Sequence, residues 1–145
     1  MRITSSVDYA TRVMVKLSEL GKGETLSAEK LYETEGIPRD FIDQLLLKLR
    51  RAGLVLSRRG AQGGYALAKP ASAITLGMVV RAVEDNVFDM VCDRFARRKQ
   101  DCRHFAGCGI RPVWRKLAAL VEDYLEDVSI AEVAKGNGRA AEPRA

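Results

Sequence analysis

The chain has 145 residues, 47% hydrophobic and 30% charged, a length and composition typical of one folded domain rather than a disordered chain. No run approaches the roughly 18 apolar residues of a membrane-spanning helix, and the first residues lack the apolar core of a secretory signal. We therefore expect a cytoplasmic, reduced protein with no membrane partner. Its three cysteines are an odd number, which does not suit a disulfide framework.

The net charge of +5 is unevenly distributed along the chain. Residues 38–69 hold seven lysines and arginines against two aspartates, and residues 92–116 hold eight against two. The chain after Leu117 is acidic. All three cysteines lie in the second basic segment, so the charge and the thiols call for a joint explanation.

Apolar residues at helical spacing predict three helices in the first third of the chain, at about residues 5–20, 28–34 and 38–52. Ser5 or Ser6 can cap the first helix and Ser27 the second. Pro38 suits the first turn of the third, because the missing N–H would have no partner there.

The third helix divides into two faces, with Leu47 alone out of place on the polar one. We expect its apolar face to consist of Phe41, Ile42, Leu45, Leu46, Leu49 and Ala52. The polar face holds Arg39, Asp40, Asp43, Gln44, Lys48, Arg50 and Arg51. A face with these donors and acceptors is suited to contact with DNA.

Two short strands, residues 54–57 and 65–68, are predicted around a basic, glycine-rich turn, which indicates a β-hairpin. Beyond it, Thr75 caps a helix to about Asp85. A long helix runs from Pro112 to about Asp127, and Ser129 caps a short helix ending near Lys135. The long helix carries a wide apolar stripe that can contact both its own domain and a partner helix.

This order predicts a mainly α fold with a small β-hairpin, a winged helix-turn-helix domain followed by a long C-terminal dimerisation helix. We expect residues 1–70 to form the DNA-binding domain and residues 71–135 to hold a cysteine loop and the dimerisation helices. Residues 136–145 have the composition of a disordered tail.

The winged-helix pattern predicts that the third helix enters the major groove of DNA. Its side chains Arg39, Gln44 and Lys48 can then contact bases or phosphates. Arg58 and Arg59 at the hairpin tip suit the negative potential of the minor groove. Gly60, Gly63 and Gly64 allow a close approach of the backbone.

The cysteines follow the spacing Cys92-x9-Cys102-x5-Cys108, which lacks the paired C-x2-4-C of structural zinc sites. Three thiolates on a glycine-containing loop can instead hold an iron–sulfur cluster, and nearby arginines would stabilise them. A fourth ligand is then needed. The candidates are His104, which lies between two cysteines, and Asp8 on the first helix.

These features resemble those of the IscR/NsrR/RirA-type regulators. The resemblance rests on five segments: MRITSSVDY at residues 1–9, GIPRDFIDQLLLKLRRAG at 36–53, LVLSRRGAQGGYAL at 54–67, ITLGMVVRAVE at 74–84, and the cysteine loop before Trp114. Such regulators are dimeric, winged-helix bacterial transcription factors, many of which sense through an iron–sulfur cluster.

The resemblance implies that Cys92, Cys102 and Cys108 are cluster ligands. The first gap is longer than the family's usual spacing, so a 2Fe–2S and a 4Fe–4S cluster both stay open. IscR-like members have a histidine ligand where this chain has Arg111. Asp8 matches an aspartate that NsrR-like members contribute from the partner subunit, so we favour Asp8 over His104.

Two DNA contacts are also implied by the resemblance. Arg59 matches the wing arginine of the family. Asp43 matches an acidic base-reading residue of IscR-like members.

We therefore expect a homodimeric repressor that binds a roughly palindromic site on double-stranded DNA. An iron–sulfur cluster sensing iron, nitric oxide or redox state would control its affinity. A cluster-free regulator that uses Cys92, Cys102 and Cys108 as redox switches is the alternative. An iron–sulfur enzyme is disfavoured, because the chain has one histidine and no nucleophile motif.

Overall fold

A computed structural model describes residues 2–85, 88, 102–104 and 106–136. Cys92 and nearly all of the expected tail lie outside these residues. The described elements follow the expected order: α1 (Ser5–Ser18), α2 (Ala28–Glu35), α3 (Arg39–Arg51), β1 (Val55–Arg58), β2 (Gly64–Leu67), a 3₁₀ turn (Ala71–Ala73), α4 (Leu76–Val83), α6 (Ile110–Asp127) and α7 (Ile130–Ala134).

Most of the predicted helix caps are confirmed. The hydroxyls of Ser27, Thr75 and Ser129 each accept a hydrogen bond from the backbone N–H three residues on. The first helix differs, because Thr4 is its cap and accepts from the N–H of Val7, so the expectation for Ser5 or Ser6 was wrong. Thr4 has the extended backbone of a cap residue, whereas Ser5 already lies in the helix.

Two helix starts differ from the prediction by one or two residues. Pro38 is the cap of α3 rather than its first residue, and α6 begins at Ile110, two residues before Pro112. Proline is tolerated there because no N–H in the first turn of a helix has an intrahelical partner. The strands are likewise displaced by one residue from the expected positions, in opposite directions.

Helix α1 packs against α2, α3, α4, α7 and the hairpin, so it runs through the centre of the core. The apolar stripe predicted for this helix is Val7, Ala10, Val13, Met14, Leu17 and Leu20. All of these are buried except Leu20, which lies beyond the end of α1 and is partly buried. On α3 the buried residues are Ile42, Leu45, Leu46 and Leu49. Phe41 and Ala52 were expected in that set, but both are exposed at the edge of the apolar face.

The two strands form an antiparallel hairpin in which Val55 pairs with Leu67 and Arg58 with Gly64. Leu26, in the loop after α1, forms a further antiparallel bridge with Tyr65 through two backbone hydrogen bonds. The base of the hairpin is therefore held by a segment of the helical core as well as by its own strands.

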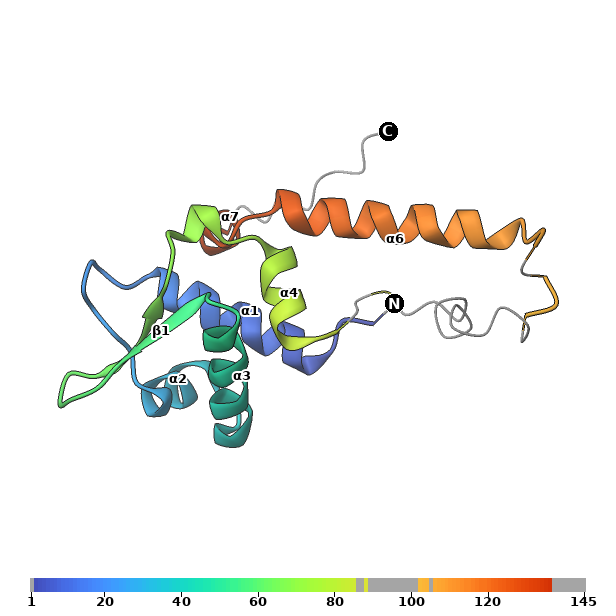
Figure 1. Ribbon diagram of the computed structural model, residues 1–145. Coiled ribbons are helices and arrows are strands. Elements are labelled where there is room, and N and C mark those ends of the chain that lie inside the picture. The colour runs from blue at the N-terminus through green and yellow to red at the C-terminus, as the bar shows by residue number, and fades with distance from the viewer. Residues whose placement is uncertain (1, 86–87, 89–101, 105, 137–145) are drawn as a thin grey trace.

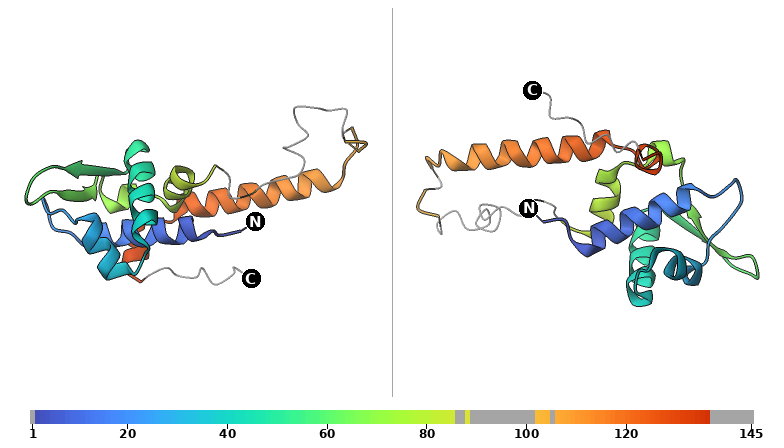
Figure 2. Two further views of the ribbon diagram at one scale, coloured as in Figure 1. Left: turned by 90° about the horizontal axis from the view of Figure 1, so that it is seen from below. Right: turned by 180° about the vertical axis from the view of Figure 1, so that it is seen from behind.

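Helix α6 extends away from the packed elements, and its far end leads to the segment that holds Cys102 and Cys108 (Figures 1 and 2). It has no buried residue. Apolar side chains exposed along it are Ile110, Val113, Trp114, Leu117, Leu120 and Tyr124. Within the described ranges, no helix has the length and apolar character needed to cross a membrane.

Candidate DNA interface and cysteine site

The exposed ridge of α3 lies opposite its buried face. Asp43, Gln44 and Leu47 are all exposed there, and none of them makes a side-chain hydrogen bond or ion pair with another described residue. These side chains are therefore open to a ligand outside the chain. Leu47, which interrupted the polar pattern, is 41% exposed and adds an apolar contact surface to the ridge.

The two flanks of α3 are held by neighbouring elements. On one flank, the ring of Phe41 lies edge-on to Tyr9 of α1, with centroids 5.5 Å apart. On the same flank, Lys48 Nζ donates to the carbonyl oxygen of Val83 at 3.0 Å. On the other flank, Arg50 donates to Ser57 Oγ of β1 at 3.3 Å. Lys48, expected at the DNA, thus has a partner inside the protein.

The hairpin carries the two arginines predicted at its tip, and the structure distinguishes them. Arg58 Nη1 donates to the carbonyl oxygen of Gly23 at 3.0 Å, so this guanidinium ties the hairpin to the loop after α1. Arg59 is exposed and makes no hydrogen bond or ion pair with any described residue. It is the hairpin cation that is free to meet a phosphate or a groove.

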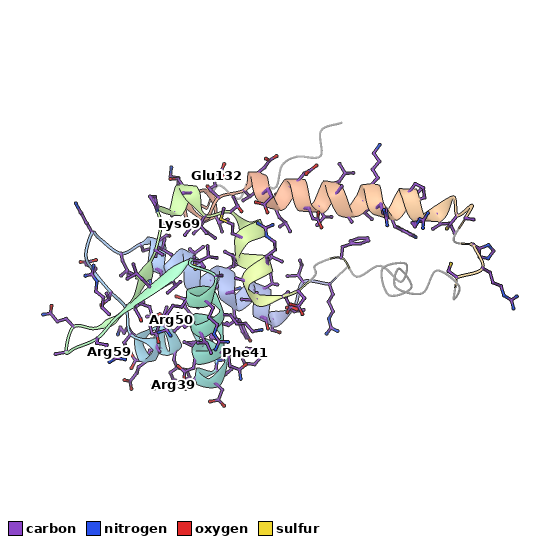
Figure 3. All side chains as sticks on the ribbon, in the orientation of Figure 1. Arg39, Phe41, Arg50, Arg59, Lys69 and Glu132 are labelled. Carbon is purple, nitrogen blue, oxygen red and sulfur yellow. The ribbon has the colours of Figure 1, made fainter. Side chains whose placement is uncertain are left out.

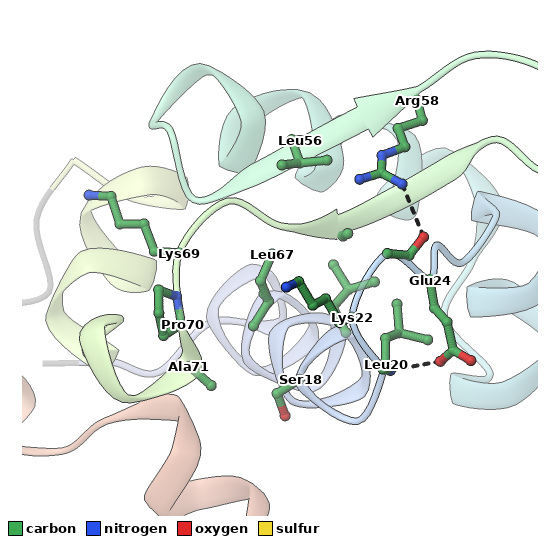
Figure 4. A pocket seen from close by; sticks show the side chains of 14 residues that line it. Ser18, Leu20, Lys22, Glu24, Leu56, Arg58, Leu67, Lys69, Pro70 and Ala71 are labelled. Atoms are coloured by element: carbon green, nitrogen blue, oxygen red, sulfur yellow. Dashed lines mark hydrogen bonds between the residues drawn. The ribbon is translucent and has the colours of Figure 1, made fainter.

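Figure 4 shows the hollow at the base of the hairpin, where Arg58 reaches Gly23 and the Glu24 carboxylate accepts from the N–H of Gly21 at 2.7 Å. Leu56 and Leu67 line its strand side. These bonds fix the loop of residues 21–25 against the strands. The base of the hairpin is therefore firmly attached, whereas its tip extends beyond the core.

The paired glycines of the turn are required by close packing of backbone. A Cβ on Gly63 would lie 2.5 Å from the carbonyl oxygen of Arg58, and one on Gly64 would lie 2.7 Å from the carbonyl of Leu26. Neither contact is compatible with a side chain. Gly60, at φ +114°, adopts a conformation that favours glycine. The structure therefore gives these glycines a role in the shape of the turn. The sequence had suggested instead that they let the backbone come close to DNA.

The free end of α3 and the tip of the hairpin lie on the same side of the molecule (Figures 1 and 2). Arg39 and Arg59 mark that side in Figure 3, whereas Lys69 lies on the other. Arg39 is exposed and has no partner among the described residues. A helix and a hairpin that present cations to one side form a surface suited to the grooves and phosphates of DNA.

Asp8 lies in the first turn of α1, where its carboxylate accepts from Arg12 Nε at 2.8 Å. The hydrogen bond and the charge of Asp8 raise the pKa of Arg12. Both side chains remain about half exposed, at 51% and 58%. The carboxylate of Asp8 is therefore accessible from outside the chain. A new partner would have to replace only the exposed ion pair with Arg12.

Cys102 and Cys108 are free, half-buried thiols near the start of α6, and His104 is exposed between them. The start of α1 and this segment lie far apart within one chain (Figures 1 and 2). Among the described residues, no three His, Cys, Asp or Glu side chains gather closely enough to hold a metal ion. Within the described part of one chain, Asp8 is therefore not near Cys102 or Cys108.

Cys108 sits directly before the first turn of α6. The backbone N–H groups of Arg111 and Ile110 donate to its sulfur and lower the pKa of this thiol. Free N–H groups at a helix start favour an anion in this way. A larger share of Cys108 is therefore thiolate than in an ordinary cysteine, and the thiolate is the form that ligates metal and attacks oxidants.

The family model for Rrf2, described as an iron-dependent transcriptional regulator, matches residues 3–136 of this chain. The chain belongs to the Rrf2 family. An Rrf2 relative named as the transcriptional regulator IscR, from Vibrio campbellii, is 33% identical over 94% of this chain and 79% of its own length. A Neisseria meningitidis relative, named as a putative transcriptional regulator, is 34% identical over 95% and 92%.

Solved structures agree with this assignment. CymR of Bacillus subtilis, titled the global cysteine regulator, matches with a TM-score of 0.76 and 25% identity over 93% of this chain and 97% of its own. IscR of T. potens matches with a TM-score of 0.71 and 26% identity over 100% and 94%. The predicted winged-helix fold is confirmed, and this Rrf2 protein is a DNA-binding transcriptional regulator rather than an enzyme.

Proposed function

We propose that this Rrf2 protein is a homodimeric repressor whose affinity for DNA depends on an iron–sulfur cluster. The cluster would be held by Cys92, Cys102 and Cys108 of one subunit and by Asp8 of the other. The main support for the proposal is that α6 extends away from the packed elements with its apolar face unburied. Cys102 and Cys108 lie just before its far end. Such a regulator acts on cytoplasmic DNA.

The apolar face of α6 supports the dimer. Trp114 and Leu117 are 47% and 40% exposed, which is costly for large apolar side chains unless another surface covers them. The helix has 18 residues, so it extends about 27 Å. Two such helices paired about a two-fold axis, running in opposite directions, would bring each thiol-bearing end back toward the other subunit.

The separation of Asp8 from the cysteines supports a ligand from the partner. The same antiparallel pairing would bring the start of one α1 toward the cysteines of the other chain. Asp8 is half exposed, and the only bond that its side chain makes with a described residue is to the exposed Arg12. His104, the alternative ligand, lies between Cys102 and Cys108 on the same chain.

The donor set fits an iron–sulfur cluster. Cys102 and Cys108 are unpaired thiols, and the N–H groups that lower the pKa of Cys108 stabilise the thiolate that a cluster needs. When bound, a cluster would supply a group whose loading and oxidation state respond to iron, oxidants and nitric oxide. The residues of this chain would hold the cluster and set the spacing of the two subunits.

We propose that DNA contact is made by Arg39, Asp43 and Gln44 of α3 and by Arg59 of the hairpin. Two half-sites related by the dimer axis would make the operator roughly palindromic. Asp43 can accept a hydrogen bond from a cytosine amine in the major groove. Gly63 and Gly64 would support this surface indirectly, by shaping the turn that carries Arg59.

A cluster-free thiol switch is the second candidate. The pKa of Cys108 is lowered by the N–H groups at the start of α6, and similar solved structures include an oxidised form of CymR from Staphylococcus aureus. In this case Cys92, Cys102 and Cys108 would change oxidation state directly. An iron–sulfur enzyme receives no support, since the relatives are named as regulators.

Anaerobic purification followed by visible absorption and iron and sulfide analysis separates the two candidates. The cluster proposal predicts a coloured protein with both elements, and loss of colour in Cys108→Ser. Asp8→Ala should shorten the lifetime of the colour in air, whereas His104→Ala, the matched control, should leave it unchanged. A colourless, iron-free protein contradicts the cluster and favours the thiol switch.

A further inference from the structure

Beside its buried apolar face, α3 has a flank that contacts the core through one aromatic pair and one polar bond. Phe41 and Lys48, seven residues apart, lie on this side, which we call the α3 seam. Phe41 meets Tyr9, the neighbour of Asp8 on α1. Lys48 meets Val83, the last residue of α4. The seam therefore joins the recognition helix to the start of α1 and the end of α4.

The bond from Lys48 satisfies a group that the helix itself cannot. The last carbonyls of a helix have no intrahelical N–H partner, and a cation near them is favoured by the helix dipole. The Val83 carbonyl is one of these, and the side chain of Val83 is buried. Lys48 Nζ reaches it at 3.0 Å across the gap between α3 and α4. One of the three N–H donors of the exposed Lys48 side chain is thus used by α4 in this structure.

The end of α4 is also held to the start of α1. Thr4 Oγ1 donates to Glu84 Oε1 at 2.6 Å, and the same threonine is the cap of α1. Asp8 follows four residues later, and beyond Asp85 the sequence runs on to Cys92. The end of α4, at Val83 and Glu84, is a junction that contacts both α3 and α1. In sequence it precedes the segment that holds the cysteines.

From this junction we infer that Lys48 is a positioning residue, which transmits the position of the α4 end to α3 and makes no contact with DNA phosphate. The sequence alone suggested the opposite, because Lys48 lies among polar residues of a recognition helix. The inference rests on the proposed function, since it concerns how the cysteine-bearing side of the protein influences DNA affinity. Coupling of this kind requires an element whose position both sites affect.

Lys48→Met tests this inference, because methionine keeps a long, flexible stem and removes the ammonium group. Lys48→Arg retains a donor. Arg51→Met is the matched control, since Arg51 is exposed on the same helix with no partner among the described residues. Anisotropy titrations of a labelled duplex carrying the protein's own promoter region would be made at several salt concentrations, with cluster-loaded and cluster-free protein.

In Lys48→Met we expect the affinity ratio between loaded and cluster-free protein to fall at least threefold toward one, while the slope of log affinity against log salt stays unchanged. A lost phosphate contact would lower that slope by about 0.9. Lys48→Arg should keep the ratio of the unmodified protein, and Arg51→Met should keep it too. A lowered slope with an unchanged ratio in Lys48→Met would overturn the inference.

If the proposed function fails, the unmodified protein itself binds DNA equally well with and without the cluster. This outcome is distinct from failure of the inference about Lys48. Hydrogen exchange of cluster-free, DNA-free protein still tests Lys48 in that case. Lys48→Met should increase exchange at the end of α4 and in α3, relative to Arg51→Met. Equal exchange in the two variants would show that the bond does not hold α3, and would overturn the inference on its own.

Discussion

Gly64 lies directly against the backbone of Leu26, so that a Cβ on the glycine would be 2.7 Å from the leucine carbonyl. The neighbouring Tyr65 exchanges two backbone hydrogen bonds with Leu26, at 2.8 and 2.9 Å. The close approach and the hydrogen bonds occur at the same point. The hairpin is joined to the loop after α1 here, and the direction of its tip depends on this joint.

Gly64→Ala should therefore destabilise the protein by about 2 kcal/mol, because the clash is with backbone that cannot move without breaking the bridge. Urea denaturation measures the change in the free energy of unfolding. Gly107→Ala is the matched control, since a Cβ there meets nothing within 4 Å. Equal stability of the two variants would show that the joint is not rigid.

Arg59→Ala should weaken binding to the protein's own promoter DNA and lower the salt slope by about 0.9, as expected for one lost phosphate contact. Lys69→Ala removes a cation on the opposite side of the molecule (Figure 3) and should leave the slope unchanged. Anisotropy titrations over a range of salt concentrations give both slopes. If the two variants behave alike, the hairpin tip does not contact DNA.

Glu126 of α6 accepts from Arg81 of α4 and from Thr75, the cap of α4, at 3.0 Å from the latter. The Arg81 hydrogen bond and, less strongly, the Thr75 bond lower the pKa of Glu126. A carboxylate with a lowered folded-state pKa adds stability above its unfolded pKa of about 4.3, and that stability is lost as pH falls through the folded value. The side chains of Arg81 and Glu126 are 60% and 38% exposed, so their ion pair adds about 0.5 kcal/mol to the free energy of unfolding.

Glu126→Gln should thus lower stability at neutral pH, and the difference from the unmodified protein should vanish as the pH falls through the lowered pKa of Glu126. Chemical denaturation at several pH values measures this. Asp123→Asn, an exposed change on the same helix, should show no such convergence. A constant difference at all pH values would mean that the ion pair does not carry the effect.

Cys108 should react with iodoacetamide with a pH midpoint below the ordinary thiol value of about 8.5, because two backbone N–H groups stabilise its thiolate. Mass spectrometry of cluster-free protein follows this residue alone. Urea-unfolded protein provides the comparison, since the N–H groups no longer face the sulfur. A midpoint equal to that of the unfolded chain would contradict the role of the helix start.

The helical core could be predicted from the sequence because burial follows helical periodicity. Val7, Val13 and Leu17 are buried as the stripe on α1 required. The caps at Ser27 and Thr75 followed from local chemistry in the same way. Both kinds of prediction rest on local sequence and do not depend on which helices pack together.

The contact of Lys48 with α4 could not be predicted in this way. Its partner is a carbonyl 35 residues away in the chain, on α4. Phe41 was assigned to the core by its spacing, but it lies at the edge of the apolar face, where Tyr9 meets it. Both contacts depend on how α1, α3 and α4 are arranged, which sequence spacing does not specify.

The most direct test of cluster-controlled DNA binding compares DNA affinity with and without the cluster. One anaerobic preparation would be divided, one half kept loaded and the other stripped with chelator, and both titrated against the same promoter duplex at one salt concentration. If the cluster controls binding, the two affinities should differ by at least tenfold, and by less than threefold when the same comparison is made in Asp8→Ala. Equal affinities of the loaded and stripped unmodified protein would contradict it.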